Sequence, residues 1–121
     1  MKFALCNEVL QDLSIEDGFA KIAEIGYAGV EIAPFTLQKN PLAINERDAE
    51  RCVNAAQSAG IEIVGLHWLM AKTEGLHITS SDEGMRRAAT DYLKKLTRLT
   101  AQMGGTIMVL GSPQQRNLEH G

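Results

Sequence analysis

The sequence predicts an α/β fold, a parallel series of strands and helices. Three times a helix-like segment ends in glycine and a short apolar run follows: Gly26 before YAGVEIA, Gly60 before IEIVGL, and Gly104-Gly105 before TIMVLG. Glycine suits the left-handed position after a helix, and a continuous apolar run suits a strand covered on both faces. With KFALC as the first strand, the chain contains four strands with a helix between each strand and the next. This order is typical of parallel sheets with right-handed crossovers.

Each predicted helix has a candidate N-terminal cap. Ser14 precedes the helix predicted over 15–25, whose first turn carries the acidic residues that the helix dipole favours. Asn45 precedes the helix over 46–59, and Ser80 with Glu83 has the capping-box spacing before the helix over 84–103. Apolar residues in this last helix recur at three- and four-residue steps, which predicts one packing face. That face consists of Ala88, Tyr92, Leu96 and Leu99.

Composition limits the classes of function. The 121 residues are 45% hydrophobic and 22% charged, which fits one soluble globular domain. The net charge of -3 leaves no basic footprint for nucleic acid, and no apolar run is long enough for a membrane span or a signal peptide, so we expect a cytoplasmic protein. Cys6 and Cys52 form no C-x-x-C pair, and we interpret them as reduced, mostly buried thiols.

Two architectures use such a series: an open doubly wound sheet, and a (β/α)8 barrel of which four strands are half. A complete barrel needs roughly 250 residues. Length alone therefore favours the small open doubly wound sheet.

The details of the sequence point to the barrel. The stretches GYAGVEIAPF, AGIEIVGLHWLM, GLHITSSDEGMRRAATDYLKKL and MVLGSPQQRN, in this order, resemble the N-terminal half of sugar phosphate isomerase/epimerase proteins. These belong to the xylose isomerase-like TIM barrel superfamily, which also contains enzymes of the endonuclease IV type. The resemblance implies a (β/α)8 barrel that binds a divalent metal (Mn²⁺, Mg²⁺, Co²⁺ or Zn²⁺) at the carboxyl ends of its strands.

The resemblance also implies that the principal metal ligands and both catalytic carboxylates lie on later strands. We therefore expect residues 1–121 to be a single partial barrel domain, truncated after its fourth strand and inactive alone. The fourth strand would leave an exposed edge, and a homo-oligomer that covers this edge is one expected outcome.

Four residues at the strand ends are candidate substrate contacts: Glu31, His67, Trp68 and Arg116. His67 is also a weak candidate metal ligand, because its position matches a zinc ligand of the endonuclease IV branch; the alternative is a histidine hydrogen-bonded for structural reasons. Trp68 is either a flat wall for a sugar or a core residue. Glu31 needs a partner, either a structural one or substrate. Arg116 could hold a phosphate beside the Gly-Ser turn or be a solvated loop residue.

Other polar residues carry weaker expectations. Asn7 and Glu8 follow the first strand and either reach the pocket mouth or act as turn and cap residues. Lys72 and His77 lie in a long loop that is either a lid or a connector, and His120 lies near the chain end, where we expect no function.

The first hypothesis is thus a sugar or sugar-phosphate isomerase/epimerase-like protein, in which a metal-bound ketose or polyol exchanges a proton in the complete barrel. One alternative is a small α/β domain that binds a ligand without catalysis. Another is a metal-dependent enzyme of the endonuclease IV type, which the acidic balance and the absence of a histidine in LGSPQ disfavour.

Overall fold

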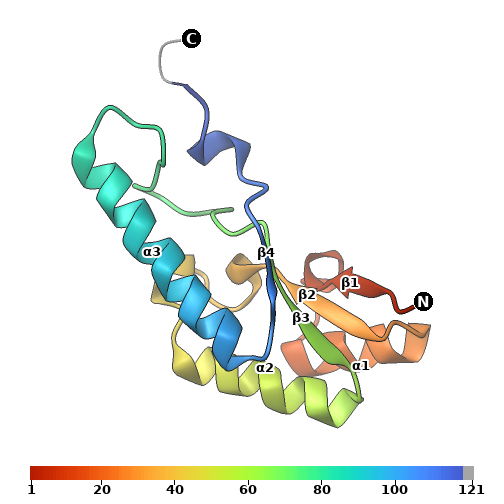
Figure 1. Cartoon of the computed structure of the whole chain (residues 1–121). Helices are drawn as coiled ribbons and strands as arrows, with labels where there is room; N and C mark the ends of the chain where they lie inside the picture. Colours follow the sequence, from red (N-terminus) through yellow and green to blue (C-terminus); the bar gives the residue numbers. More distant parts are fainter. Residues whose placement is uncertain (119–121) are drawn as a thin grey trace.

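The computed structural model describes residues 1–118 and contains a four-stranded parallel sheet with helices between successive strands (Figure 1). Its strands and α-helices are β1 (Ala4–Cys6), α1 (Ile15–Ile25), β2 (Gly29–Ile32), α2 (Glu46–Ala59), β3 (Glu62–His67), α3 (Glu83–Gln102) and β4 (Ile107–Val109). Short 3-10 helices are η1 (Asn7–Leu10), η2 (Pro34–Thr36), η3 (Pro41–Ala43) and η4 (Pro113–Gln115). The predicted alternation of strands and helices is confirmed.

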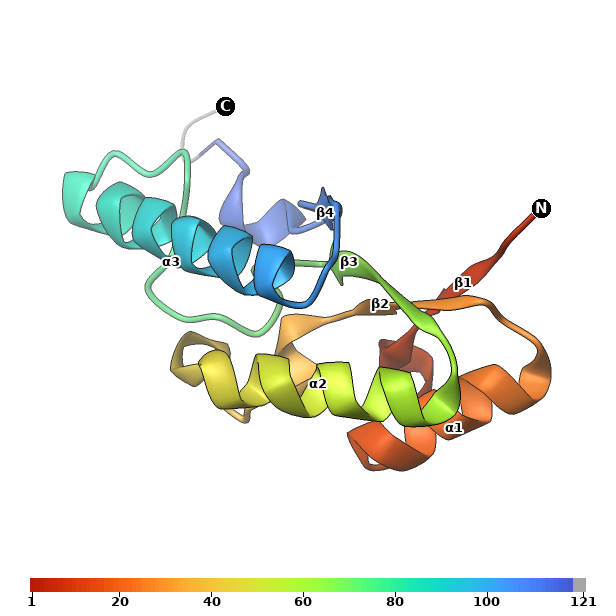
Figure 2. The same ribbon diagram turned by 60° about the horizontal axis from the view of Figure 1, so that its bottom comes forward.

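The order of the strands decides between the two expected architectures. The sheet runs β1-β2-β3-β4 without a reversal, and each neighbouring pair is parallel. Right-handed crossovers in this order place successive helices on one side of the sheet, as in a (β/α)8 barrel, whereas a doubly wound sheet reverses its strand order. The open doubly wound alternative is therefore wrong. In Figure 2, α1 and α2 lie side by side beneath the strands.

The first two helices begin and end where the sequence predicts. The Ser14 hydroxyl accepts a hydrogen bond from the Asp17 backbone N–H at 3.0 Å, which caps α1. At α2, Asn45 and Asp48 form a complete capping box. Gly26 and Gly60 end these helices in the left-handed conformation, with φ values of 104° and 70°, where a side chain would be strained.

The third helix differs from its prediction at two points. Its cap is Asp82, whose carboxylate accepts from the Met85 backbone N–H at 3.2 Å, and not Ser80. Its buried face begins at Ala89, because Ala88 is exposed, and continues through Tyr92, Leu96 and Leu99 as predicted. No helix among residues 1–118 is long and apolar enough to cross a membrane.

The hydrophobic core lies between the helices and one face of the sheet. On β2, Val30 and Ile32 are fully buried in this core. Because side chains alternate along a strand, Gly29 and Glu31 lie on the opposite face. In a barrel this opposite face is the interior, and we call it the inner face.

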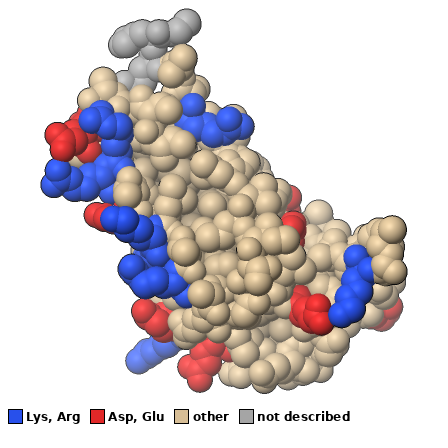
Figure 3. Space-filling view, in the orientation of Figure 1, with Lys and Arg blue, Asp and Glu red and all other residues tan. Residues whose placement is uncertain are grey.

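The inner face is open at β4. Ile107 and Val109 are 48% and 36% exposed, and among the described residues β4 pairs with β3 alone. Figure 3 shows basic side chains along α3 and, next to them, a broad surface without charged side chains over β4. The sheet thus ends at an unpaired edge beside exposed apolar side chains.

Candidate functional site

Polar side chains of β1, η1, β2 and β3 meet at the carboxyl ends of these strands. Cys6 ends β1, Glu8 follows in η1, and His67 ends β3. In the sheet register Cys6 lies opposite Glu31, and Glu31 lies opposite Gly65. Two residues on from Gly65, His67 lies on the same face by alternation. The carboxyl ends of barrel strands are where active sites are found.

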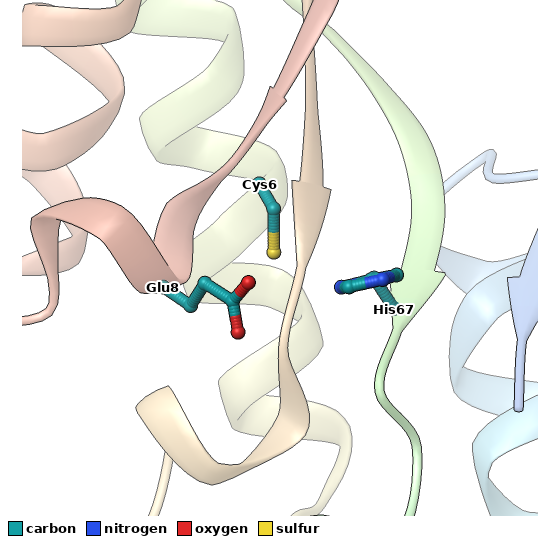
Figure 4. Close-up of side chains that lie close together, drawn as sticks. All are labelled: Cys6, Glu8 and His67. Atoms are coloured by element: carbon teal, nitrogen blue, oxygen red, sulfur yellow. The ribbon is translucent and has the colours of Figure 1, made fainter. Parts of the chain in front are cut away.

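The side chains of Cys6, Glu8 and His67 point toward one another across β2 (Figure 4). One ligand-type atom from each, a thiol sulfur, a carboxylate oxygen and an imidazole nitrogen, lies within 4.8 Å of the other two. We call these three residues the strand-end cluster. All three are partly buried, so they line the inner face without being sealed from it.

Two polar atoms of the cluster are buried and have no partner. Glu8 Oε2 and His67 Nδ1 are each shielded from solvent and make no hydrogen bond within residues 1–118. A buried polar group without a partner costs about 1–3 kcal/mol. His67 Nδ1 is therefore not held by a hydrogen bond at the strand end.

The thiol of Cys6 is shifted toward its protonated form. Burial is the main reason that its pKa lies above the ordinary value, and the negative charges of Glu8 and Glu31 raise it further. A hydrogen bond with the Glu8 backbone lowers the pKa only in part. Glu31 is the register partner of Cys6 on β2, which places it beside the cluster.

Asn7 lies between Cys6 and Glu8 in the sequence and anchors this part of the cluster. It is nearly fully buried: its Oδ1 accepts from the Ala33 backbone N–H at 2.9 Å, and its Nδ2 donates to Thr36 Oγ1 at 2.8 Å. These bonds tie η1 to the segment after β2. Of the two readings of residues 7 and 8, Asn7 fits the structural one, while Glu8 reaches the inner face.

Glu31 is partly exposed and makes no structural pairing. No ion pair or side-chain hydrogen bond among residues 1–118 includes its carboxylate. Its carboxylate is therefore available to a ligand on the inner face.

Trp68 lies at the edge of this region and is 37% exposed, so it is not a core residue. Its ring meets Phe35 edge to face, with 5.7 Å between the ring centroids. The Lys72 ammonium lies 4.2 Å from the centroid of the Phe35 ring. Trp68 and Lys72 also line a hollow of about 220 Å³ together with Gln114 and neighbouring residues. An aromatic surface thus borders the strand ends.

The segment after β4 binds back onto the long loop. Ser112 is fully buried, and its hydroxyl accepts from the Met70 backbone N–H at 3.0 Å. His77 Nε2 lies 2.7 Å from Asn117 Oδ1. These bonds hold the loop between β3 and α3 at Met70 and at His77, so the loop is a fixed connector. Arg116 is exposed and does not line the hollow beside Trp68, and His120 lies outside the described residues.

Sequence reasoning missed Cys6 as a site residue. The structure brings Glu31 and His67 together with Cys6 and Glu8, and it leaves Arg116 apart. The position of Cys6 in the sequence could have identified it. Cys6 ends a predicted strand, as His67 does, and the ends of parallel strands lie near one another. The absence of a C-x-x-C motif was no guide, because the ligand-type atoms come from elements distant in sequence.

Comparison with known proteins places this arrangement in a family. A family model for the xylose isomerase-like TIM barrel matches residues 19–120. No curated protein sequence is significantly similar to the chain. The fold is similar to that of a crystal structure of D-psicose 3-epimerase in the presence of D-fructose, with a TM-score of 0.66 and 14% identity.

That likeness covers 86% of this chain and 35% of the epimerase chain, so residues 1–121 span about a third of its length. At this level of identity the likeness concerns the fold. The prediction of a partial barrel is confirmed. Because the family model matches well over half of its residues, the chain belongs to the xylose isomerase-like TIM barrel family.

Proposed function

We propose that the chain forms the N-terminal part of a sugar isomerase/epimerase-like barrel and supplies one wall of its substrate pocket. The observation that carries this proposal is the convergence of Glu8, Glu31 and His67 on the inner face of the strand ends, beside the exposed ring of Trp68. The family and the fold shared with D-psicose 3-epimerase support a sugar as the ligand.

The chemistry of these side chains suits a polyhydroxylated ligand. Carboxylates accept hydrogen bonds from hydroxyl groups, and an imidazole both donates and accepts. Trp68 and Phe35 offer apolar faces against which the C–H side of a sugar packs.

We further propose that the chain alone does not catalyse the reaction. Proton transfer at a carbon next to a carbonyl needs an acid and a base placed on that carbon. In the complete barrel these carboxylates, and the divalent metal that polarises the carbonyl oxygen, would come from strands that the chain does not contain. Glu8, Glu31 and His67 would bind and orient the sugar hydroxyl groups.

The unpaired edge of β4 is where another strand would continue the barrel wall. An unpaired strand edge next to exposed apolar side chains is a template for association. Ile107 and Val109 supply such side chains. We propose that, in the absence of further strands, a second copy of the chain covers this edge.

Trp68 gives a direct test of sugar binding because it is the only tryptophan. We expect its fluorescence to change in a saturable manner when D-fructose is titrated into the 121-residue chain. Glu31→Gln and His67→Gln should weaken the response at least tenfold. His77→Gln is the matched control, because His77 bonds to Asn117 in the loop.

A response equal in all four proteins, or none in the unaltered chain, would refute the proposed pocket. Catalysis is tested separately by incorporation of solvent deuterium into the ketose. We expect none with the chain alone, and measurable incorporation would contradict its proposed inactivity.

A further inference from the structure

The strand-end cluster has the composition of a metal site as well as of a sugar contact. We propose that Cys6, Glu8 and His67 bind a divalent cation of the zinc type through a thiolate, a carboxylate oxygen and an imidazole nitrogen. The resemblance assigns the principal metal ligands to later strands and matches only His67 to a zinc ligand, so Cys6 and Glu8 are new in this role. The site shares Glu8 and His67 with the proposed sugar wall, but it is tested without sugar.

The spacing of the three atoms supports a bridging cation. Metal–ligand bonds of about 2.0–2.3 Å in a tetrahedral site separate the ligand atoms by roughly 3.3–3.8 Å. The three atoms lie within 4.8 Å of one another, so small side-chain rotations bring them to these separations. The three side chains already point into one common space (Figure 4).

The unpaired atoms give a second, independent reason. Glu8 Oε2 and His67 Nδ1 are both buried and both without a hydrogen-bond partner. They come from different elements, and each of the two residues also brings a ligand-type atom within 4.8 Å of the Cys6 sulfur. A single cation would satisfy these atoms together, whereas no other described polar group does so.

The scaffold around the cluster holds the ligands in place. Asn7, between Cys6 and Glu8, is anchored to Ala33 and Thr36 by two hydrogen bonds. Cys6 and His67 lie on strands held in register with β2 between them. The backbone segments that carry the three ligands are therefore held in place.

The donor set selects the kind of cation. A thiolate with an imidazole and a carboxylate suits Zn²⁺ or Co²⁺, whereas Mg²⁺ and Ca²⁺ prefer oxygen ligands alone. Three protein ligands leave a fourth position for water or another small ligand. Because the cluster is only partly buried, this position would open onto the inner face.

Cobalt titration tests the site through its colour. We expect the tag-free, chelator-treated chain to bind one Co²⁺, with a thiolate-to-cobalt charge-transfer band and the intense visible bands of a four-coordinate ion. An equal concentration of Zn²⁺ should abolish these bands, and Mg²⁺ should leave them unchanged.

Variants assign the ligands. Cys6→Ser should abolish the charge-transfer band, and Glu8→Gln and His67→Gln should each weaken Co²⁺ binding at least tenfold. Two matched controls should leave the spectrum unchanged: Cys52→Ser removes the other thiol, which lies buried in α2, and His77→Gln removes an imidazole that bonds to Asn117 in the loop and is not in the cluster. Circular dichroism checks that each variant folds.

A measurement on the unaltered chain covers the case in which Cys6→Ser fails to fold. Zn²⁺ should slow alkylation of Cys6 at least tenfold, as mapped by mass spectrometry. Loss of the band in Cys52→Ser, its survival in Cys6→Ser, or equal alkylation of Cys6 with and without Zn²⁺ would overturn the proposal. No sugar is present in these experiments, so their failure leaves the sugar titration as a separate test.

Discussion

Gly65 lies against the backbone of Ile107, its partner in the parallel register of β3 and β4. A Cβ atom built on Gly65 would overlap the Ile107 carbonyl oxygen and lie 2.7 Å from its carbonyl carbon. Gly105 approaches from the segment just before β4, and a Cβ added there would lie 2.9 Å from the Gly65 Cα. These two glycines allow the fourth strand to join the sheet.

Substitution of Gly65 should therefore weaken the fold. We expect Gly65→Ala to lower the free energy of unfolding by about 2 kcal/mol or more, because the clash involves backbone that cannot move aside. The matched control is Gly18→Ala in α1, where an added Cβ meets nothing within 4 Å. It should be neutral or stabilise the chain by up to about 1 kcal/mol, since alanine is the better helix former. Urea unfolding followed by circular dichroism measures both, and equal stability of the two variants would contradict the close approach.

The ion pair between α1 and α2 should make the free energy of unfolding depend on pH in the acidic range. The Arg51 guanidinium donates two hydrogen bonds of 2.7 Å to the Glu16 carboxylate, which is the main reason that the pKa of Glu16 falls from 4.5 to about 2. A carboxylate with a lowered pKa stabilises the folded state above its unfolded pKa, and this stabilisation is lost as the pH falls toward 2.

Both side chains of this pair are about half exposed, so solvent screening limits its effect. We expect Glu16→Gln to lower the free energy of unfolding by about 0.5 kcal/mol at neutral pH, and we expect this loss to disappear as the pH falls through 2. Arg51→Gln should cost as much, and the double variant no more than either. Additive losses in the double variant would show that the two residues do not act as a pair.

Local and non-local features of the sequence differ in how well they predict the structure. The starts of α1 and α2 were predictable because their caps are local. Ser14 caps α1, and Asn45 with Asp48 caps α2, through hydrogen bonds between residues at most three positions apart. The cap of α3 was misplaced, because Ser80, Ser81 and Asp82 are all able to cap a helix and the packing of the loop decides among them.

The candidate site shows the same limit. Its position at the strand ends follows from the parallel order, and Glu31 and His67 were found on that basis. Cys6 was not, because the convergence of residues 6, 8 and 67 depends on the strand register, which sequence spacing does not encode. The substrate role of these residues stays a prediction.

The two cysteines should react very differently with thiol reagents. Cys52 is fully buried in α2, and burial is the main reason that its pKa rises to about 12. Cys6 is only partly buried. Because the thiolate is the reactive form, we expect one thiol to react in the folded, metal-free chain and the second only after unfolding in urea. Cys6→Ser should abolish the native reaction and Cys52→Ser should leave it unchanged; labelling of Cys52 in the folded chain would show that α2 opens readily.

Association through the fourth strand should depend on its apolar side chains. Val109 is 36% exposed on β4, beside the unpaired edge, and a second copy that covers this edge would bury it. A lysine there would bring a charge into the contact, so Val109→Lys should shift the chain from dimers or larger species to monomers in analytical ultracentrifugation. Val9→Lys makes the same change on η1, where Val9 is 61% exposed, and should leave the sedimentation unchanged. A chain that sediments as a monomer at every concentration, or that responds equally to both substitutions, would show that β4 is not the surface of association.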